Sequence, residues 1–206
     1  VYYALLIFMI FMEYRRDIMR VFDFDNTIYD GESVFDFYIF SIRYNPKVLK
    51  YLFVIIYHII WYKLGRVNIP ELERAIKKYA REYINSFKSI DVMVDEFWDK
   101  NIHKIKSWYI PESDDVILTA SFDFIMEKLQ KRAGIKNCFC STTNFDTMEI
   151  KYINIGENKL KIFQKNFGNS AVADEFYTDS ILDMPMIKIS KKAFLVKGNK
   201  IERINI

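Results

Sequence analysis

A chain of 206 residues with 51% hydrophobic and 17% aromatic side chains has enough apolar material for a substantial core, which excludes disorder of the whole chain. The formal charge is only +3, without a block of like charges, so nucleic acid is not an expected partner. The two cysteines, Cys138 and Cys140, are one residue apart and lack zinc-site spacing. They are expected to be free thiols in a reducing compartment, which favours a cytoplasmic location.

The first 18 residues differ from the rest. Residues 1–12 are apolar throughout, and Glu13, Arg15 and Arg16 follow. The run is short for a membrane span and lacks the basic leader of a secretory signal. Residues 1–17 are therefore treated as a hydrophobic extension with two open interpretations. In the first, translation starts at Met19 and the extension is an artefact. In the second, the extension is a short hydrophobic anchor with its basic flank in the cytoplasm.

A first core strand is expected at residues 18–22, and a long helical stretch follows it. Residues 31–112 show one helical pattern after another, including a capping box in which Glu71 stands three residues after Asn68. A further helix is expected over residues 89–109, ended by Pro111. The sequence thus predicts an all-helical insertion after the first strand.

One helix of this insertion has no polar face. It is expected to begin at Asn45-Pro46 and to end at Gly65. From Tyr51 to Tyr62 every residue except His58 is apolar or aromatic. Such a helix is usually buried, so burial or a homodimer contact is favoured over contact with a membrane surface. Basic residues near its ends keep membrane association open as an alternative; they are Lys47, Lys50, Lys63 and Arg66.

The rest of the chain alternates between strand and helix patterns. Helices are expected over residues 122–133 and 158–167, each followed by a glycine. Further strands are expected at 116–119, 138–141, 175–178 and 193–196, and a hairpin at 145–155. The prediction is an α/β fold: a Rossmann-like, mostly parallel sheet with helices on both faces and the helical insertion between its first two strands.

Two aspartates, Asp23 and Asp25, follow the first strand one residue apart. Parallel sheets bind ligands at this end of their strands. Carboxylates so close together repel each other unless a proton or a cation intervenes, and Mg²⁺ prefers such oxygen ligands. An aspartate beside that ion is a candidate nucleophile toward phosphorus. The alternative is a solvated acidic turn.

With Thr27 two residues after Asp25, this motif resembles the opening motif of the haloacid dehalogenase-like superfamily of phosphohydrolases. The resemblance implies that Asp23 is the nucleophile and a metal ligand. It implies that Asp25 is the general acid and base, with its backbone carbonyl on the metal. The implied cofactor is Mg²⁺.

Three later segments match the other motifs of the superfamily in order. Thr119 stands at the tip of the second strand, where the resemblance implies phosphate binding by its hydroxyl and by neighbouring Ala120 and Ser121. Lys159 is chosen over Lys161 and Lys165 as the charge-neutralising lysine. The fourth motif implies two further metal-binding carboxylates, with the second acting as a ligand through water or as an orienting group; they are Asp179 and Asp183.

The motif order and the position of the insertion resemble the phosphoserine-phosphatase-like branch. This implies a catalytic core of residues 18–30 and 113–206 and a cap of residues 31–112 that closes over the substrate. Thr119 and Thr178 depart from the branch, which usually has Ser and Gly there, and Phe122 replaces a common Pro. Residues after the first motif are expected near the substrate; they are Thr27, Asp30, Glu32 and Ser33.

The predicted function is a magnesium-dependent phosphatase that hydrolyses a small phosphomonoester through an aspartyl-phosphate. A phosphotransferase would use the same residues, with an acceptor hydroxyl in place of water. A non-enzymatic module that binds a membrane or a protein partner through residues 51–62 is the other alternative.

Overall fold

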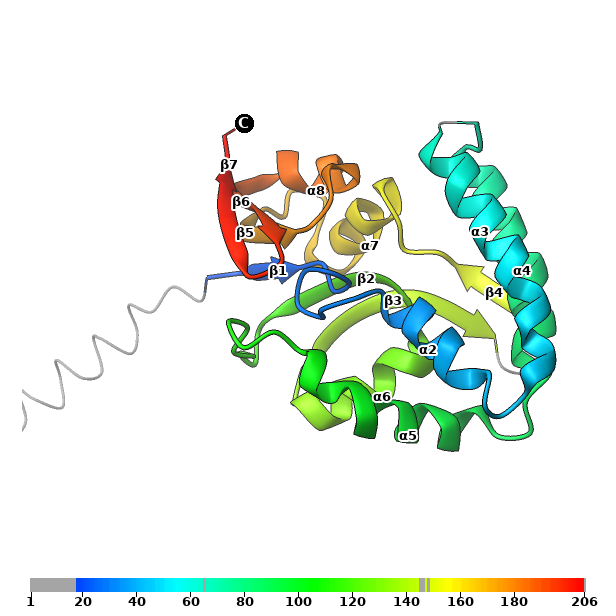
Figure 1. The fold of residues 1–206 in the computed structure, drawn as a ribbon. Helices are drawn as coiled ribbons and strands as arrows, with labels where there is room; N and C mark the ends of the chain where they lie inside the picture. Colours follow the sequence, from blue (N-terminus) through cyan, green and yellow to red (C-terminus); the bar gives the residue numbers. More distant parts are fainter. Residues whose placement is uncertain (1–17, 65, 145–146, 148, 206) are drawn as a thin grey trace, which may run out of the picture.

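A computed structural model describes residues 18–64, 66–144, 147 and 149–205. The predicted extension at residues 1–17 lies outside the described residues. The described strands form one seven-stranded sheet in the order β4-β3-β2-β1-β5-β6-β7 (Figure 1). Its parallel part contains β1 (Arg20–Phe22), β2 (Val116–Phe122), β3 (Asn137–Asn144), β5 (Ala173–Thr178) and β6 (Ser190–Lys197). The antiparallel edges are β4 (Glu149–Tyr152) and β7 (Lys200–Ile204).

The short strand β1 lies in the middle of the sheet. Val21 pairs with Val116 of β2 on one side and with Phe176 of β5 on the other. Because the three strands are parallel, the residues that follow them meet at one edge of the sheet. The first, second and fourth sequence motifs lie at this edge.

Helices cover both faces of the sheet, as predicted. One face packs against α5 (Ile90–Asn101) and α6 (Asp123–Ala133), and the other against α7 (Glu157–Phe167) and α8 (Met184–Lys188) (Figure 1). β1 contributes to both cores because its side chains alternate: Phe22 packs in the first and Val21 in the second. The α/β fold class is therefore confirmed.

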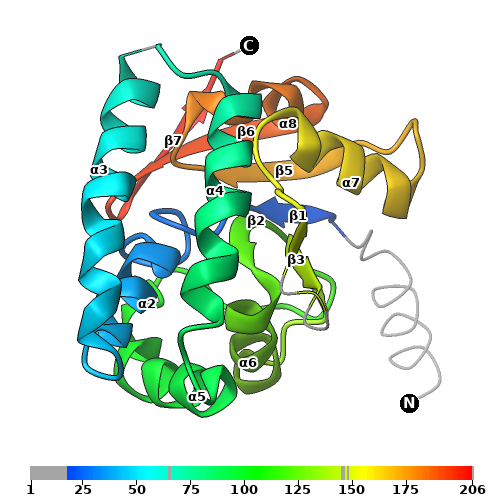
Figure 2. The ribbon, with the colours of Figure 1, turned by 90° about the vertical axis from the view of Figure 1, so that its right-hand side faces the viewer.

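Helices α2 (Ser33–Ser41), α3 (Lys50–Lys63), α4 (Ile69–Ile84) and α5 all lie between β1 and β2 in the chain. A 3₁₀ turn (Pro46–Leu49) precedes α3. The predicted capping box begins α4, since the Asn68 side chain accepts from the Glu71 N–H and the Glu71 side chain accepts from the Asn68 N–H. α3 and α4 stand side by side across the end to which the parallel strands point (Figures 1 and 2).

Burial of the apolar helix, one of the two favoured interpretations, is wrong for one of its faces. In α3, Tyr51 is buried, but Phe53 and Tyr57 are 77% and 54% exposed. A pair of helices at the edge of a small protein has too few neighbours to cover a helix on all sides. Within the part of the chain that the structure describes, no helix combines the length and the apolar character needed to cross a bilayer.

The helix predicted over residues 89–109 is too long. α5 ends at Asn101, and a 3₁₀ turn (Ile102–Lys104) follows. Beyond it Ile105 forms a β-bridge with Tyr29, and the N–H of Lys106 donates to the carbonyl of Ile28 (2.8 Å). Pairing with a segment far away in the chain thus replaces the helical hydrogen bonds that the local pattern suggested.

The predicted hairpin over residues 145–155 is also wrong in its pairing. The observed hairpin is instead formed by β3 and β4, in which Thr143 pairs with Ile150. Residues 145, 146 and 148 lie outside the described part.

Strand β7 was not predicted. It follows a turn at Gly198, whose φ is +59°, and four of its five residues are exposed, so it lacks the apolar run of a core strand. Cys138 and Cys140 are free.

Candidate active site

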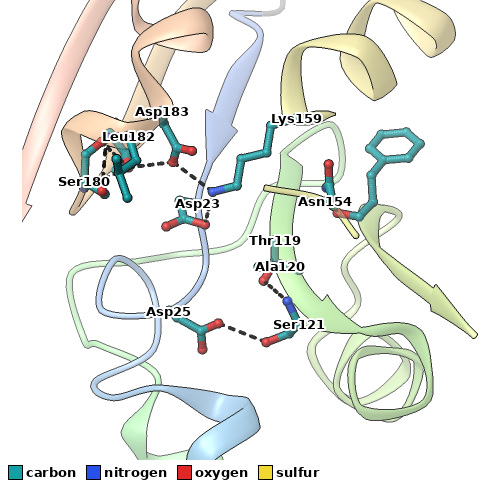
Figure 3. A network of polar contacts seen from close by, with 12 residues as sticks. Asp23, Asp25, Thr119, Ala120, Ser121, Asn154, Lys159, Ser180, Leu182 and Asp183 are labelled. Carbon is teal, nitrogen blue, oxygen red and sulfur yellow. Dashed lines mark hydrogen bonds and ion pairs between the residues drawn. The ribbon is translucent and has the colours of Figure 1, made fainter. Parts of the chain in front are cut away.

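Asp23 follows β1 at the centre of the sheet edge. Its N–H donates to the carbonyl of Tyr177 (2.8 Å), which extends the pairing between β1 and β5 by one hydrogen bond. Asp23 is only 7% exposed, and its Oδ1 lies 2.6 Å from Nζ of Lys159. The same Nζ lies 2.8 Å from Oδ2 of Asp183 (Figure 3). One buried lysine thus links the first and fourth motifs.

The charges of this cluster do not balance. Burial raises the pKa of Asp23 to about 6, Lys159 opposes this rise, and the nearby Asp25 and Asp179 add to it. Burial also lowers the pKa of Lys159, but the attraction of Asp23 and Asp183 outweighs this and raises it above its ordinary value. Lys159 is therefore a stable cation amid several carboxylates, and Asp23 ionises at a higher pH than an ordinary aspartate, so that added positive charge would favour its ionised form.

Asp25 is held by groups from two other segments. Its Oδ1 accepts from the N–H of Ser33 (2.6 Å), and its Oδ2 accepts from the hydroxyl of Ser121 (2.9 Å). The hydroxyls of Ser33 and Ser121 are themselves 2.5 Å apart. Burial raises the pKa of Asp25 to about 6, against the lowering effect of the hydrogen bonds from Ser33. Its carboxyl is thus oriented and has a pKa suited to proton transfer near neutral pH.

A tight loop turns the chain between Asp25 and α2. The carbonyl of Phe24 accepts from the N–H groups of the three residues 27–29, and Asn26 has a φ of +55°. The buried Lys106, which the sequence analysis missed, donates from Nζ to the carbonyl of Asn26 and to that of Gly198 (2.8 Å). No local sequence pattern indicated this contact, because its three segments are far apart in the chain.

Asp183 is oriented by a residue whose contribution was also missed. Oδ2 of Asp183 accepts from the hydroxyl of Thr178 (2.9 Å) as well as from Lys159. Thr178, at the end of β5, is fully buried. The sequence analysis had marked it only as a departure from Gly. Asp179, the residue after it, lies within hydrogen-bonding reach of Asp23, and burial raises its pKa.

The two predicted phosphate-binding hydroxyls, those of Thr119 and Ser121, are buried and already hydrogen-bonded. Thr119 is buried, and its hydroxyl accepts from the N–H of Ser121 (3.0 Å). Ser121 is directed at Asp25, and the carbonyl of Ala120 accepts from Ser141 (2.7 Å). The helix expected to start at residue 122 begins at Asp123. Ser121 therefore has to release Asp25 before its hydroxyl can donate to phosphate, whereas Thr119 accepts in its contact and can still donate its own hydroxyl hydrogen.

The four residues expected near the substrate differ in exposure. Asp30 and Glu32 are exposed, and Glu32 accepts from the side-chain amide of Asn26 (2.7 Å). Ser33 is buried beside Asp25. Thr27 is fully buried, and its hydroxyl has no hydrogen-bond partner among the described residues. Thr27 thus faces the interior, whereas Asp30 and Glu32 face solvent.

Comparison with known proteins identifies the family. The model of the haloacid dehalogenase-like hydrolases matches residues 21–188, which include all four motifs. The chain belongs to this family of hydrolases. A comparison with curated proteins finds no match.

Solved structures agree with the haloacid dehalogenase-like fold. A protein of unknown function from Bordetella pertussis Tohama I has a TM-score of 0.66 at 14% identity, over 85% of this chain and 87% of that one. A haloacid dehalogenase family hydrolase from Salmonella enterica serovar Typhi has a TM-score of 0.50 at 13% identity, over 84% and 60%. A phosphoserine phosphohydrolase-like protein from Francisella tularensis has 0.48 at 17%, over 85% of both. At these identities the first two support the fold and not a substrate.

The carboxylate oxygens of this haloacid dehalogenase-like site are donors of the type that a hard divalent cation prefers. Asp23 and Asp179 are neighbouring carboxylates whose pKa values are raised by burial, so added positive charge would stabilise their ionised forms. Asp183 instead binds Lys159 and Thr178. Among the described residues, no three acidic, His or Cys side chains are already arranged around one point. The protein therefore offers suitable oxygen donors without a preassembled set of three side-chain ligands.

Proposed function

We propose that the protein is a magnesium-dependent phosphatase that hydrolyses a phosphomonoester through an aspartyl-phosphate on Asp23. The observation that supports this most directly is the buried contact of 2.6 Å between Asp23 and Lys159 at the end of the central strand. It sets a carboxylate beside a fixed cation at the edge where parallel sheets bind ligands. A carboxylate nucleophile and a charge-neutralising lysine are the groups that phosphoryl transfer needs.

In the first step a carboxylate oxygen of Asp23 attacks phosphorus. The bond between phosphorus and the leaving oxygen breaks, and Asp25 donates its proton to that oxygen. A pKa of about 6 for Asp25 keeps a protonated fraction available near neutral pH. The products of this step are a free alcohol and an acyl phosphate on Asp23, and Lys159 neutralises charge on the phosphoryl oxygens.

In the second step Asp25, now a carboxylate, takes a proton from water. The water oxygen attacks phosphorus, and the bond between phosphorus and the Asp23 oxygen breaks. Inorganic phosphate leaves, and both carboxyl groups return to their starting states. Ser33 and Ser121 hold the Asp25 carboxyl through both steps because they bind one oxygen each.

Asp23, Asp179 and the main-chain carbonyl of Asp25 are the proposed Mg²⁺ ligands, and Asp183 is a ligand through water or an orienting group. When bound, the ion supplies charge neutralisation and alignment of the phosphoryl group. Thr119, Ala120 and Ser121 remain the proposed phosphate-binding segment.

We also propose that residues 31–112 act as a cap on a core of residues 18–30 and 113–206, in a cytoplasmic enzyme. The exposed Asp30 and Glu32 and the buried Ser33 are the proposed residues near the substrate. The substrate is a small phosphorylated molecule. The apolar character of α3 favours an apolar or lipid-like leaving group, an idea that fails if lipid phosphates are poorer substrates than small polar ones.

The test is phosphate release from an aryl phosphate by the wild type, with Mg²⁺ and with a chelator. Asp23→Asn should lower kcat by about 10³-fold or more, whereas the exposed Asp114→Asn should leave it unchanged. Multiple-turnover release that survives Asp23→Asn or the chelator would contradict the proposal. A single turnover that continues only with an added acceptor alcohol would identify a phosphotransferase, and the absence of any turnover would favour the non-enzymatic alternative.

A further inference from the structure

Helix α3 and its two flanking residues carry a row of exposed apolar side chains. Phe53, Tyr57, Ile60 and Leu64 are 77%, 54%, 49% and 62% exposed. Leu49 and Ile56, each 45% exposed, extend the same row. At about 100° per residue these six positions fall within an arc of about 100° on the helix. We call this set of six residues the apolar row.

The opposite side of α3 is the one that packs on the protein. Val48 and Tyr51 are buried, in a small core with Tyr38 of α2 and beside Tyr83 of α4. Tyr51 also donates from its hydroxyl to Glu82 (3.0 Å). In Figure 2, α3 lies at the outer edge of the molecule, on the far side of α4 from α7 and α8. The apolar row therefore points away from the described protein.

A surface-exposed helix face normally carries charged residues, and a soluble monomer seldom exposes a long contiguous set of large apolar side chains. Here the row includes two aromatic residues and four aliphatic ones, over about four helical turns. Packing among residues 18–64, 66–144 and 149–205 does not account for it, because all six side chains are at least 45% exposed there.

The chain segment that carries the apolar row has charge of one sign. Residues 37–70 contain five basic residues and no acidic one. Lys47 and Lys50 are exposed at the beginning of α3, and Arg66 is exposed just after its end. Long basic side chains at the border of an apolar face reach toward anionic headgroups while their methylene stems cover apolar surface.

We propose that the apolar row rests on the surface of a membrane that contains anionic lipids, with the axis of α3 in the plane of the interface. The helix has 14 residues, about 21 Å, so it is short for a span of about 30 Å and suits a position along the surface. A second copy of the chain fits less well. A two-fold contact through this face would bring the same acid-free basic segment close to itself.

The first measurement is sedimentation of the full chain with vesicles. Binding is expected to vesicles of phosphatidylcholine mixed with phosphatidylglycerol, and to weaken with added salt. The variant Phe53→Ser/Ile60→Ser should partition about tenfold less or weaker still, because it removes two apolar side chains from the interface. The matched control is Val92→Ser/Ile110→Ser, which changes residues 54% and 72% exposed outside the row and should bind like the wild type.

A local measurement separates this face from residues 1–12. In a Trp61→Phe background, Phe53→Trp places a fluorophore in the apolar row, and Val92→Trp places one on α5. Brominated lipids should quench the first and not the second. Sedimentation without quenching of Phe53→Trp would overturn the proposal, because the contact would lie elsewhere. Absence of vesicle binding, or a dimer in solution that Phe53→Ser/Ile60→Ser dissociates, would overturn it too. Phosphate release from a soluble substrate is a separate readout, so failure of one proposal is distinguishable from failure of the other.

Discussion

A single oxygen of Asp183 joins two residues of the candidate site, since it accepts from both Lys159 and Thr178. Thr178, at the end of β5, therefore orients the carboxylate that binds Lys159, and Lys159 in turn contacts Asp23, the proposed nucleophile. Because this network is buried, water cannot replace a donor that is lost, so removal of one hydrogen bond is expected to destabilise the protein.

Thr178→Val removes the donated hydrogen bond and keeps the shape of the side chain. We expect a loss of about 1–3 kcal/mol in the free energy of unfolding and a fall in kcat of about tenfold or more as Asp183 and Lys159 lose their alignment. Thr178→Ser keeps the hydroxyl and should stay close to the wild type. Denaturant unfolding and steady-state kinetics check both variants, and equal behaviour of Val and Ser would contradict the orienting role.

Lys106 offers a second test. Lys106→Met leaves the carbonyls of Asn26 and Gly198 without their side-chain donor. The expected loss is about 1–3 kcal/mol of stability, with lower kcat because Asn26 adjoins Asp25. Lys131→Met, on the exposed side of α6, is the matched control. If both variants unfold at the same denaturant concentration, the contact is not stabilising.

Sequence motifs were informative where function requires a residue type at a fixed place. The structure brings Asp23, Lys159 and Asp183 together, although their catalytic roles stay predictions. No sequence motif indicated the residues whose role is to position other residues. Ser33 was named only for a place near the substrate, and its N–H also binds Asp25. Lys106 joins three segments between residues 26 and 198.

At the scale of elements, the loop after β1 depends on Gly31. Its φ is +139°, and a Cβ there would lie 2.9 Å from Oδ2 of Asp36. That oxygen already accepts from Tyr29 (2.7 Å) and Lys104 (2.8 Å). The loop thus needs a residue without a side chain, both for its conformation and for space.

Gly31→Ala is expected to cost about 1–3 kcal/mol of stability and to lower kcat, because Ser33, two residues on, orients Asp25. Gly168→Ala is the control for conformational strain: its φ is +101°, with nothing within 4 Å of the added Cβ. It should lose stability with little change in kcat. Thermal unfolding and kinetics distinguish the two, and an unchanged kcat in Gly31→Ala would contradict the link to Asp25.

The predicted helices are confirmed where the local sequence pattern and the tertiary contacts agree, as in α7 and in α6, which is followed by Gly134. They fail where distant pairing decides. The periodic pattern continues to residue 109, but pairing of Ile105 with Tyr29 ends the helical region earlier. The exposed edge strand β7 lacks the apolar signal of a core strand and is defined only by its pairing with β6.

At the scale of the whole molecule, the excess of buried carboxylates makes stability depend on pH. The pKa values of Asp23 and Asp25 are about 6 in the folded protein, above about 3.9 in an unfolded chain. The folded state therefore binds more protons between these values. Stability of the metal-free protein should fall as pH rises from about 4 to about 6.

Mg²⁺ should reverse this loss where the carboxylates are ionised. We expect it to raise Tm more at pH 8 than at pH 5, because protons compete with the cation for the same oxygens. Thermal unfolding with and without Mg²⁺ at both pH values is the measurement, and Asp179→Asn should reduce the shift. An equal shift at both pH values would contradict a site made of these carboxylates.

The bridge between Tyr29 and Ile105 also bears on how such a protein diversifies. The chain leaves the sheet region and returns to it at two hydrogen-bonded neighbours, although 75 residues separate them in sequence. A segment spliced between these two points therefore need not lengthen or reroute any strand. Evolution, or a protein engineer, is free to exchange α3 and α4 as a cassette, provided that Ser33 of α2, which binds Asp25, and α5, which packs on the sheet, are kept.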